Sequence, residues 1–383
     1  MKKKVISVLL CAAMATGILA GCAGTTAPAP EAAAPAAEEA APAEEAAPAE
    51  EAAPAEEAAA EEAAPASDAA AGTFAIVTKS AGNPFMDRLA SGFSEVIEAA
   101  GGTVVRQDPE SATADAQITV IQSLISQGVN TIAISANDAN ALISVCNEAR
   151  DAGIKVLTLD SDVDPSARAV FCNQAGVEAV GQQLIDAVYD LTGGEGQYAI
   201  LSATSQATNQ NAWIDAMKAI QEGDEKYSKI ELVEVAYGDD EPQKSTDQTQ
   251  ALLQNYPDLK VICAPTTVGI AAAAKVLQDQ KSSVKLTGLG LPSEMAEYIG
   301  DDDAHSCPYM FLWNPIDLGR LAGYASLALY DGTITGAVGD TFEAPTLEAS
   351  PYTIVDNGAG TEIILGPPFK FDSSNIDEWK VVY

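Results

Sequence analysis

The sequence predicts an α/β fold of two doubly wound domains, each a parallel sheet covered by helices on both faces. Three observations lead to this prediction. Short apolar, β-branched runs alternate with helical periodicities from residue 73 onward. The runs are apolar almost throughout, as in strands buried on both faces. The alternation restarts after residue 174, and roughly 310 residues suit two domains better than one core.

The first set of elements begins with a short apolar strand and a helix. Phe85, Leu89 and Phe93 recur on one helix face, and Gly101 and Gly102 end that helix. The expected strands span residues 74–78, 104–105, 131–135, 156–159 and 169–172. The expected helices span residues 85–100, 116–127 and 142–152.

The second set repeats the alternation, and a last strand is expected to return to the first domain. The expected strands span residues 198–201, 230–235, 261–263, 285–289 and 310–313, with a short strand at 361–365. The expected helices span residues 177–191, 213–220, 245–255, 270–278, 293–299 and 318–330. The predicted first lobe is therefore 73–174 plus 309–335, and the second is 175–308 plus 336–383.

The N-terminal residues indicate export. Three lysines at 2–4 precede an apolar run too short for a permanent membrane span. The run ends in Leu19-Ala-Gly-Cys22, which resembles the bacterial lipobox, whose cysteine is acylated after cleavage. We therefore expect a signal peptide at 1–21 and a lipid anchor on Cys22, at the extracytoplasmic face of the bacterial membrane. The alternative is an ordinary signal peptide that contains a cysteine.

Residues 22–72 form a distinct segment of Ala, Pro and Glu. The segment has almost no large apolar side chain to bury, and its prolines interrupt helices. We expect a disordered stalk between membrane and folded part. A tail with a partner of its own is the alternative.

Composition excludes several kinds of partner. A formal charge of −35 argues against nucleic acid and anionic lipid headgroups. His305 is the only histidine, and no C-x-x-C pair is present, so no metal site is expected. Outside the N-terminal region the cysteines are Cys146, Cys172, Cys263 and Cys307, which are either free thiols or disulfides.

Polar residues follow the ends of the first-domain strands, where ligands bind in doubly wound sheets. Lys79 and Phe85 flank the loop after the first strand, and Phe85 offers a flat apolar face to a ring. Lys79 could instead be solvated, and Phe85 could pack in the core. Asp160 and Asp162 follow the fourth strand, and a carboxylate can accept bonds from adjacent hydroxyls. A turn cap, a metal pair and a glycosidase pair are the alternatives for the two aspartates.

The second set offers further polar residues at equivalent places. Asn209 and Gln210 can both donate and accept hydrogen bonds, although Asn209 could instead cap a helix. Pro265 and Thr267 follow a later strand, where Thr267 is also a plausible N-cap. Trp313 ends the returning strand and is either part of the site or part of the core.

At these residues the chain resembles type I periplasmic sugar-binding proteins, and within them the autoinducer-2 and rhamnose receptors. The resemblance is carried by Val77-Thr-Lys-Ser-Ala-Gly-Asn-Pro-Phe85, Val156-Leu-Thr-Leu-Asp-Ser-Asp162, Asn209-Gln-Asn-Ala-Trp213, Cys263-Ala-Pro265 and Phe311-Leu-Trp313. It implies two Rossmann-like lobes joined by three crossover strands that close on a ligand. It also implies a monomeric, non-enzymatic, cofactor-free binding protein that serves an ABC permease and its ATPase.

The resemblance also assigns roles to single residues. The ligand-binding positions of the autoinducer-2 receptors fall on Lys79, Asp160, Asn209, Gln210, Pro265 and Thr267. Asn209 stands where that pattern has Asp, and Thr267 where it has Ala. The neutral amide at 209 favours a deoxysugar, pentose or hexose over autoinducer-2.

An enzyme and a sensory subunit are the alternatives to a transport receptor. A dinucleotide enzyme would need a G-x-G-x-x-G turn, which the loop from Lys79 to Pro84 lacks. His305 is expected near the start of a strand, away from the cleft, so Ser/His/Asp catalysis has no support. A subunit that presents ligand to a chemoreceptor or sensor kinase remains open, because the same closed form would serve both.

Overall fold

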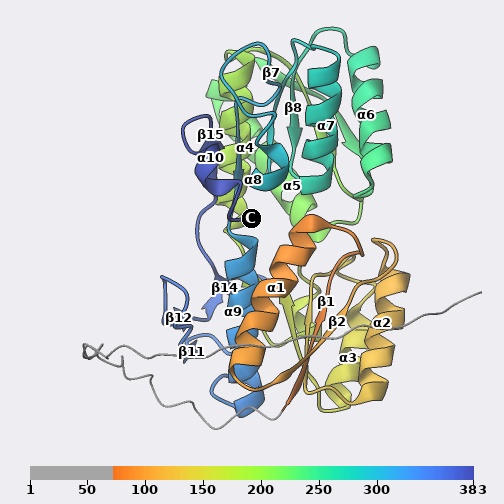
Figure 1. Cartoon of the computed structure of the whole chain (residues 1–383), viewed down its shortest axis with the longest axis vertical. Helices are drawn as coiled ribbons and strands as arrows, with labels where there is room; N and C mark the ends of the chain where they lie inside the picture. Colours follow the sequence, from red (N-terminus) through yellow and green to blue (C-terminus); the bar gives the residue numbers. More distant parts are fainter. Residues whose placement is uncertain (1–71) are drawn as a thin grey trace, which may run out of the picture. The chain divides into compact units, whose positions relative to one another are not determined.

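The computed structural model describes residues 72–383 (Figure 1). The predicted signal peptide, Cys22 and the predicted stalk up to residue 71 lie outside the described residues. Within 72–383, the longest apolar helices still fall short of what a membrane crossing requires.

The first lobe is built on a seven-stranded sheet with the order β13-β14-β5-β4-β3-β1-β2. Its strands are β1 (Thr73–Val77), β2 (Thr103–Gln107), β3 (Thr131–Ile134), β4 (Lys155–Leu159), β5 (Phe171–Asn173), β13 (Val355–Asp356) and β14 (Thr361–Ile364). Neighbouring strands run parallel except β13 and β14. The strand order reverses at β1, which is where ligand sites form in such sheets.

Helices cover both faces of this sheet. Figure 1 shows α1 (Pro84–Ala99) and α9 (Pro315–Asp331) beside each other on one side, and α2 (Ala114–Gln127) and α3 (Ile143–Asp151) on the other. Strand β1 is buried on both faces. Phe74 and Ile76 join the core under α1 and α9, whereas Ala75 and Val77 join the core under α2 and α3. This explains why the strand is apolar without alternation.

Two glycines allow α1 and α9 to approach closely. A Cβ on Gly92 would lie 1.9 Å from the carbonyl oxygen of Ile316, and one on Gly319 would lie 1.9 Å from that of Leu89. Any side chain at either position would force the helices apart. The close contact fixes the start of α1, which opens directly onto the candidate site.

The second lobe is built on a four-stranded parallel sheet with the order β7-β6-β8-β9. Its strands are β6 (Gly196–Ser202), β7 (Ile230–Tyr237), β8 (Leu259–Ala264) and β9 (Lys285–Gly288). Its helices are α4 (Val177–Thr192), α5 (Thr208–Gly223), α6 (Pro242–Asn255), α7 (Thr267–Asp279), α8 (Pro292–Met295) and α10 (Ile376–Trp379). Strand order reverses at β6, as it does at β1 in the first lobe.

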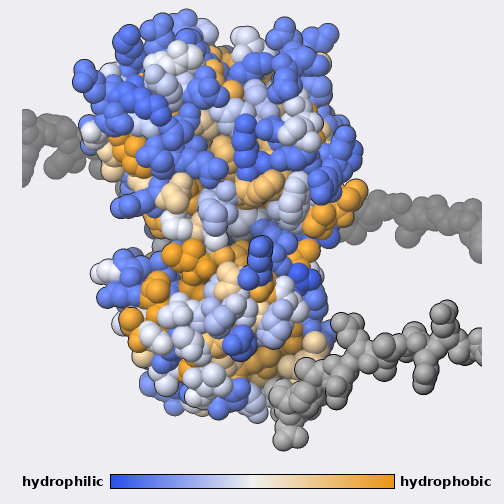
Figure 2. All heavy atoms as spheres, turned by 90° about the vertical axis from the view of Figure 1, so that its left-hand side faces the viewer, coloured by the Kyte–Doolittle hydropathy of each residue, from blue (hydrophilic) through white to orange (hydrophobic). Residues whose placement is uncertain are grey.

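A two-stranded ribbon extends the second lobe. Strand β10 (Tyr309–Leu312) pairs antiparallel with β15 (Phe369–Asp372), and a bridge joins Phe311 to Leu289 just after β9. The remaining short elements are the 3₁₀ turns Pro165–Ala167 and Glu225–Tyr227 and the pair β11 (Thr341–Phe342) and β12 (Tyr352–Thr353). On the face that carries β15, α10 and β12, Figure 2 shows apolar side chains gathered between more polar surfaces of the two lobes.

The chain crosses between the lobes three times. It crosses after β5, after β10 and after β14. The first and third crossings are held together by a hydrogen bond from Leu365 N to Asn173 O of 2.8 Å. The expected fold class, two doubly wound lobes with a three-strand hinge, is confirmed.

Two of the expected lobe boundaries differ from the observed strand pairing. The sequence predicts residues 309–312 in the first lobe, but β10 joins the second-lobe strands. It predicts residues 355–364 in the second lobe, but β14 pairs with β5. An apolar run indicates that a strand is buried, and it carries no information about which strand lies beside it.

The four cysteines of the described chain are buried free thiols. Burial raises the pKa of Cys146, Cys172 and Cys263 to about 12, so these thiols stay protonated at neutral pH. Buried, protonated thiols behave as small apolar side chains of the core.

Candidate ligand-binding site

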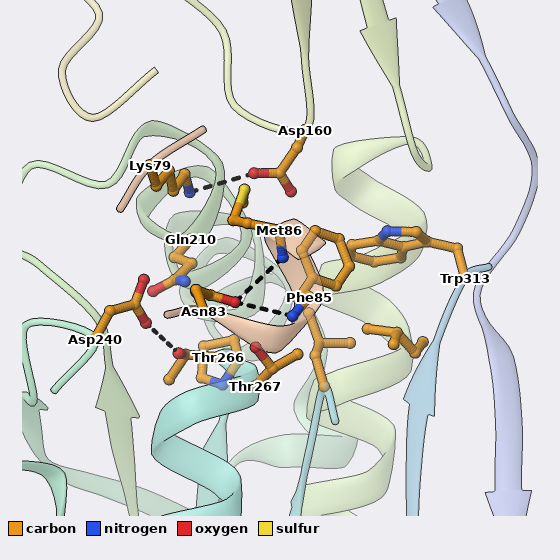
Figure 3. A pocket seen from close by; sticks show the side chains of 13 residues that line it. Lys79, Asn83, Phe85, Met86, Asp160, Gln210, Asp240, Thr266, Thr267 and Trp313 are labelled. Carbon is orange, nitrogen blue, oxygen red and sulfur yellow. Dashed lines mark hydrogen bonds and ion pairs between the residues drawn. The ribbon is translucent and has the colours of Figure 1, made fainter. Parts of the chain in front are cut away.

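Residues at the carboxyl ends of the strands of both lobes surround one cavity (Figure 3). The cavity is lined by Lys79, Asn83, Phe85, Met86, Asp160, Gln210, Asp240, Pro265, Thr266, Thr267, Leu289, Leu312 and Trp313. Among these, the residues singled out from the sequence are Lys79, Phe85, Asp160, Gln210, Pro265, Thr267 and Trp313. The structure therefore brings most of the expected site residues together.

Lys79 and Asp160 form a buried ion pair on the first-lobe side. Lys79 Nζ lies 3.4 Å from Asp160 Oδ2, and the two residues are only 4% and 3% exposed. Ser135 Oγ donates a 2.7 Å hydrogen bond to the same carboxylate oxygen. Asp160 has a left-handed backbone, φ +62°, which aspartate tolerates better than most residues. The turn after β4 thus holds a charged acceptor at the cavity.

Asn209 of α5 bridges the two lobes without lining the cavity. Its Oδ1 accepts a 3.1 Å hydrogen bond from Lys79 Nζ, and its Nδ2 donates a 3.2 Å hydrogen bond to Asp160 Oδ1. The helix begins after Ala207, so Asn209 is not the N-cap. Its amide instead satisfies both members of the first-lobe ion pair.

Gln210 is held in position by its own lobe. Its Oε1 accepts hydrogen bonds of 2.8 Å from Ser202 Oγ and from Ala203 N. These two bonds orient the amide so that its nitrogen is the end available to the cavity (Figure 3). Thr267 begins α7, whose N-cap is Thr266, so the cap expected at 267 lies one residue earlier.

Asp240 is a cavity residue that the sequence reasoning missed. Thr266 Oγ1 donates a 2.7 Å hydrogen bond to Asp240 Oδ1 (Figure 3). Burial raises the pKa of Asp240, although the nearby Lys79 charge and the Thr266 bond act in the opposite direction. A signal was present: Gly238-Asp-Asp240 follows the expected strand at 230–235.

One wall of the cavity is apolar and largely aromatic. The rings of Phe85 and Trp313 meet edge to face with centroids 6.3 Å apart, and Trp213 packs behind Trp313 at 5.6 Å. Met86 and Leu312 continue this wall. Asn83 caps α1 through hydrogen bonds from Phe85 N and Met86 N, which fixes both side chains at the helix start. Trp313 therefore serves both the core and the cavity.

The cavity is small. It measures about 40 Å³, which holds roughly three water molecules. The polar side chains around it bond to one another, as in the contacts among Lys79, Asp160 and Asn209. A sugar ring therefore enters only if these bonds are exchanged for bonds to its hydroxyls and the lobes move apart.

Asp162 does not belong to the cavity. Its carboxylate forms two bonds with Arg168, Nε to Oδ1 at 2.7 Å and Nη2 to Oδ2 at 2.6 Å, and also accepts from Thr158. Arg168 also donates to Thr361 O, which ties β14 to this turn. The expectation of a ligand role for Asp162 is not supported by this placement, because a bidentate arginine occupies its carboxylate. Within residues 72–383, no cluster of three metal-ligating side chains is found.

The sequence from residue 74 to residue 334 matches the family model described as periplasmic binding protein domain. The chain belongs to this family. A structure of an ABC transporter solute-binding protein from Clostridium phytofermentas, with bound L-rhamnose, is 59% identical. That similarity covers 82% of this chain and all of the other, with a TM-score of 0.81.

Two further relatives are more distant. LsrB from Clostridium saccharobutylicum, in complex with AI-2, is 24% identical over 80% of this chain and 99% of its own, with a TM-score of 0.74. That similarity shows the fold alone. A D-ribose/D-allose-binding protein from Pseudomonas aeruginosa is 28% identical over half of this chain. The match spans 61% of that relative, which is less than two thirds of its length.

Proposed function

We propose that this protein is the extracytoplasmic substrate-binding component of an ABC importer and binds a small neutral sugar, with L-rhamnose the first candidate. The observation that carries the proposal is the similarity, at 59% identity over 82% of this chain and all of the other, to a solute-binding protein with bound L-rhamnose. The cavity between the lobes supplies the chemistry that such a ligand requires.

The two sides of the cavity match the two sides of a deoxysugar. On the polar side, Asp160 accepts bonds from neighbouring hydroxyls, while Lys79 and the Gln210 amide donate to ring and hydroxyl oxygens. On the apolar side, Phe85 and Trp313 offer surfaces for C–H groups and a methyl group. Hydrogen bonds in a cavity that excludes water are strong and orient the ligand.

Closure of the lobes would couple binding to transport. Asn209 belongs to the second lobe and forms hydrogen bonds with Lys79 and Asp160 of the first lobe. A ligand that replaces these bonds would itself bond to both lobes and hold them together. The closed form is then what the permease, driven by its ATPase, recognises. Affinity, orientation and closure all come from side chains and need no catalytic group.

The N-terminal segment supports anchoring by lipid. We infer that Cys22 is acylated and that residues 23–72 hold a monomeric receptor away from the membrane. In cells fed a labelled fatty acid, the protein should incorporate the label and its Cys22→Ser variant should not. Equal labelling of the two proteins would contradict the anchor.

Autoinducer-2 is the second candidate ligand. Lys79, Asp160, Gln210 and Pro265 agree with the residues expected for its receptors, and all four line the cavity. The neutral Asn209 argues against it, because the charged acceptor of that pattern is missing. Presentation of ligand to a chemoreceptor would use the same closed form.

Calorimetric titration of the Cys22→Ser protein, produced without its signal peptide, tests the proposal. The ligands are L-rhamnose, D-ribose, D-xylose, D-galactose and autoinducer-2. L-Rhamnose should bind most tightly and raise the melting temperature, because a ligand at a hundred times its Kd stabilises the folded state by about 2.7 kcal/mol. If autoinducer-2 binds most tightly, the order of the two candidate ligands is reversed. If none of the sugars binds, the proposed function is wrong.

A further inference from the structure

A wide groove adjoins the small cavity on the cleft side away from Trp313. Its volume is about 780 Å³, against about 40 Å³ for the cavity. Asn83 and Asp240 line both spaces. A group added to a ligand in the cavity could therefore extend past Asn83 and Asp240 into this groove.

Both lobes build the groove mainly from small residues. The first lobe contributes the loop 80–84 and residues 110–112, and the second contributes the turn 239–242, α7 and the region of α8. Ala271 and Ala272 present only methyl groups from α7, and Val268 and the ring of Tyr298 add apolar surface. Small side chains leave the width that a substituent of several atoms needs.

The groove is acidic. The carboxylates that line it, besides the shared Asp240, are Glu110, Asp239, Glu241, Glu294 and Glu297. The one cation in the lining, Lys275, is paired with Asp279 at 2.9 Å, and Asp239 is paired with Lys244. Burial raises the pKa of Glu294 and so favours its neutral form, which leaves the acidic character mainly to Glu110, Glu241 and Glu297. A group in the groove therefore meets a negative potential, which disfavours phosphate or carboxylate and favours neutral or cationic groups.

We propose that this groove receives a substituent carried by the bound sugar, so that the ligand class extends to O-substituted deoxysugars with neutral or cationic substituents. The inference rests on the proposed function, since it requires a sugar in the cavity. It differs from that function in assigning a second subsite, formed by α7 and the turn after β7.

Titration with singly substituted rhamnoses tests the subsite. Each derivative of L-rhamnose carries a single O-propyl group. The group is placed at position 2, 3 or 4, or at position 1 as the α or the β anomer. At least one derivative should bind within about threefold of L-rhamnose, because its chain lies in the groove. At that position, the aminoethyl derivative should bind about twofold to fivefold tighter than the propyl derivative, which is the contribution of an exposed ion pair. The derivative with a phosphate there should bind more weakly than the propyl derivative.

A variant that fills the groove tests it separately from the cavity. Ala272→Phe fills the groove from α7, and Ala272 does not line the sugar cavity. The variant should keep the affinity for L-rhamnose within about twofold and lose at least tenfold for the tolerated propyl derivative. Gln254→Phe, at an exposed position of α6 in the same lobe, is the matched control and should alter neither.

The outcomes distinguish the two proposals. If L-rhamnose binds but every propyl derivative loses a hundredfold or more, the groove takes no substituent and the inference falls while the function stands. The inference also falls if Ala272→Phe weakens a tolerated derivative no more than it weakens L-rhamnose. If L-rhamnose and the other sugars all fail to bind, the proposed function itself fails.

Discussion

Replacing Asp160 by asparagine should weaken sugar binding while preserving the fold of the site. Asparagine keeps the shape of the side chain and also tolerates the left-handed backbone at this position. What it removes is the negative charge that Lys79 faces at 3.4 Å. The substitution therefore tests charge rather than packing.

The expected magnitude follows from the bonds a sugar would make. A hydrogen bond to a charged group contributes about 1.5–3 kcal/mol, against about 0.5–1.5 kcal/mol for a neutral one. If two neighbouring hydroxyls donate to Asp160, the loss is about 2–3 kcal/mol, or roughly 30-fold to 150-fold in Kd. Calorimetric titration with L-rhamnose measures this change directly.

A double variant separates binding from stability. Asp160→Asn alone leaves the buried Lys79 charge without its closest counter-ion, so the melting temperature without sugar should fall. Adding Lys79→Met removes that buried charge and should restore much of the stability without restoring affinity. Asp160→Asn binding L-rhamnose within threefold of the parent protein would refute the assignment of Asp160 as a ligand residue.

Three further substitutions probe other parts of the site. Trp313→Phe should reduce the fluorescence change caused by L-rhamnose and weaken binding by up to about tenfold through loss of ring contact; an unaltered signal would place the indole outside the site. Asp162→Asn should lower the melting temperature, because it removes the charge that the buried Arg168 faces at 2.6 Å, at a cost of about 1.5–3 kcal/mol, yet leave affinity within about twofold; a large loss of affinity would return Asp162 to the site. Asp240→Asn should raise the melting temperature at pH 7. Because the pKa of Asp240 is raised in the folded state, the parent protein loses stability as the pH rises through that pKa. The gain in melting temperature of the variant should therefore vanish in acid. A difference between the two proteins that does not depend on pH would contradict the burial of the Asp240 charge as its cause.

Much of the fold and of the site is readable in the sequence. Continuous apolar runs such as Phe74–Val77 identify strands buried on both faces, and the restart of the pattern indicates a second lobe. Because ligands bind beyond strand ends, the residues after each strand form a short list of candidates. Asp240 satisfies the same rule, because it follows the strand at 230–235.

Other features depend on contacts between distant parts of the chain. Lys79 and Asn209 are 130 residues apart, and nothing in either local pattern indicates their bond. Arg168 engages Asp162 because the backbone between them turns back, and that bond, not residue type, removes Asp162 from the site. Likewise β14 could pair at the edge of either sheet, and it lies beside β5 in the structure.

The sequence by itself determined which segments are strands and helices, which polar residues end the strands, and that the chain has two lobes. Those properties are local, because a burial pattern repeats every two or 3.6 residues. Only the tertiary structure decided which strand lies beside which, which carboxylate stays free for a ligand, and that a groove continues outward from the cavity. Those properties depend on distances between residues far apart in sequence, which packing sets.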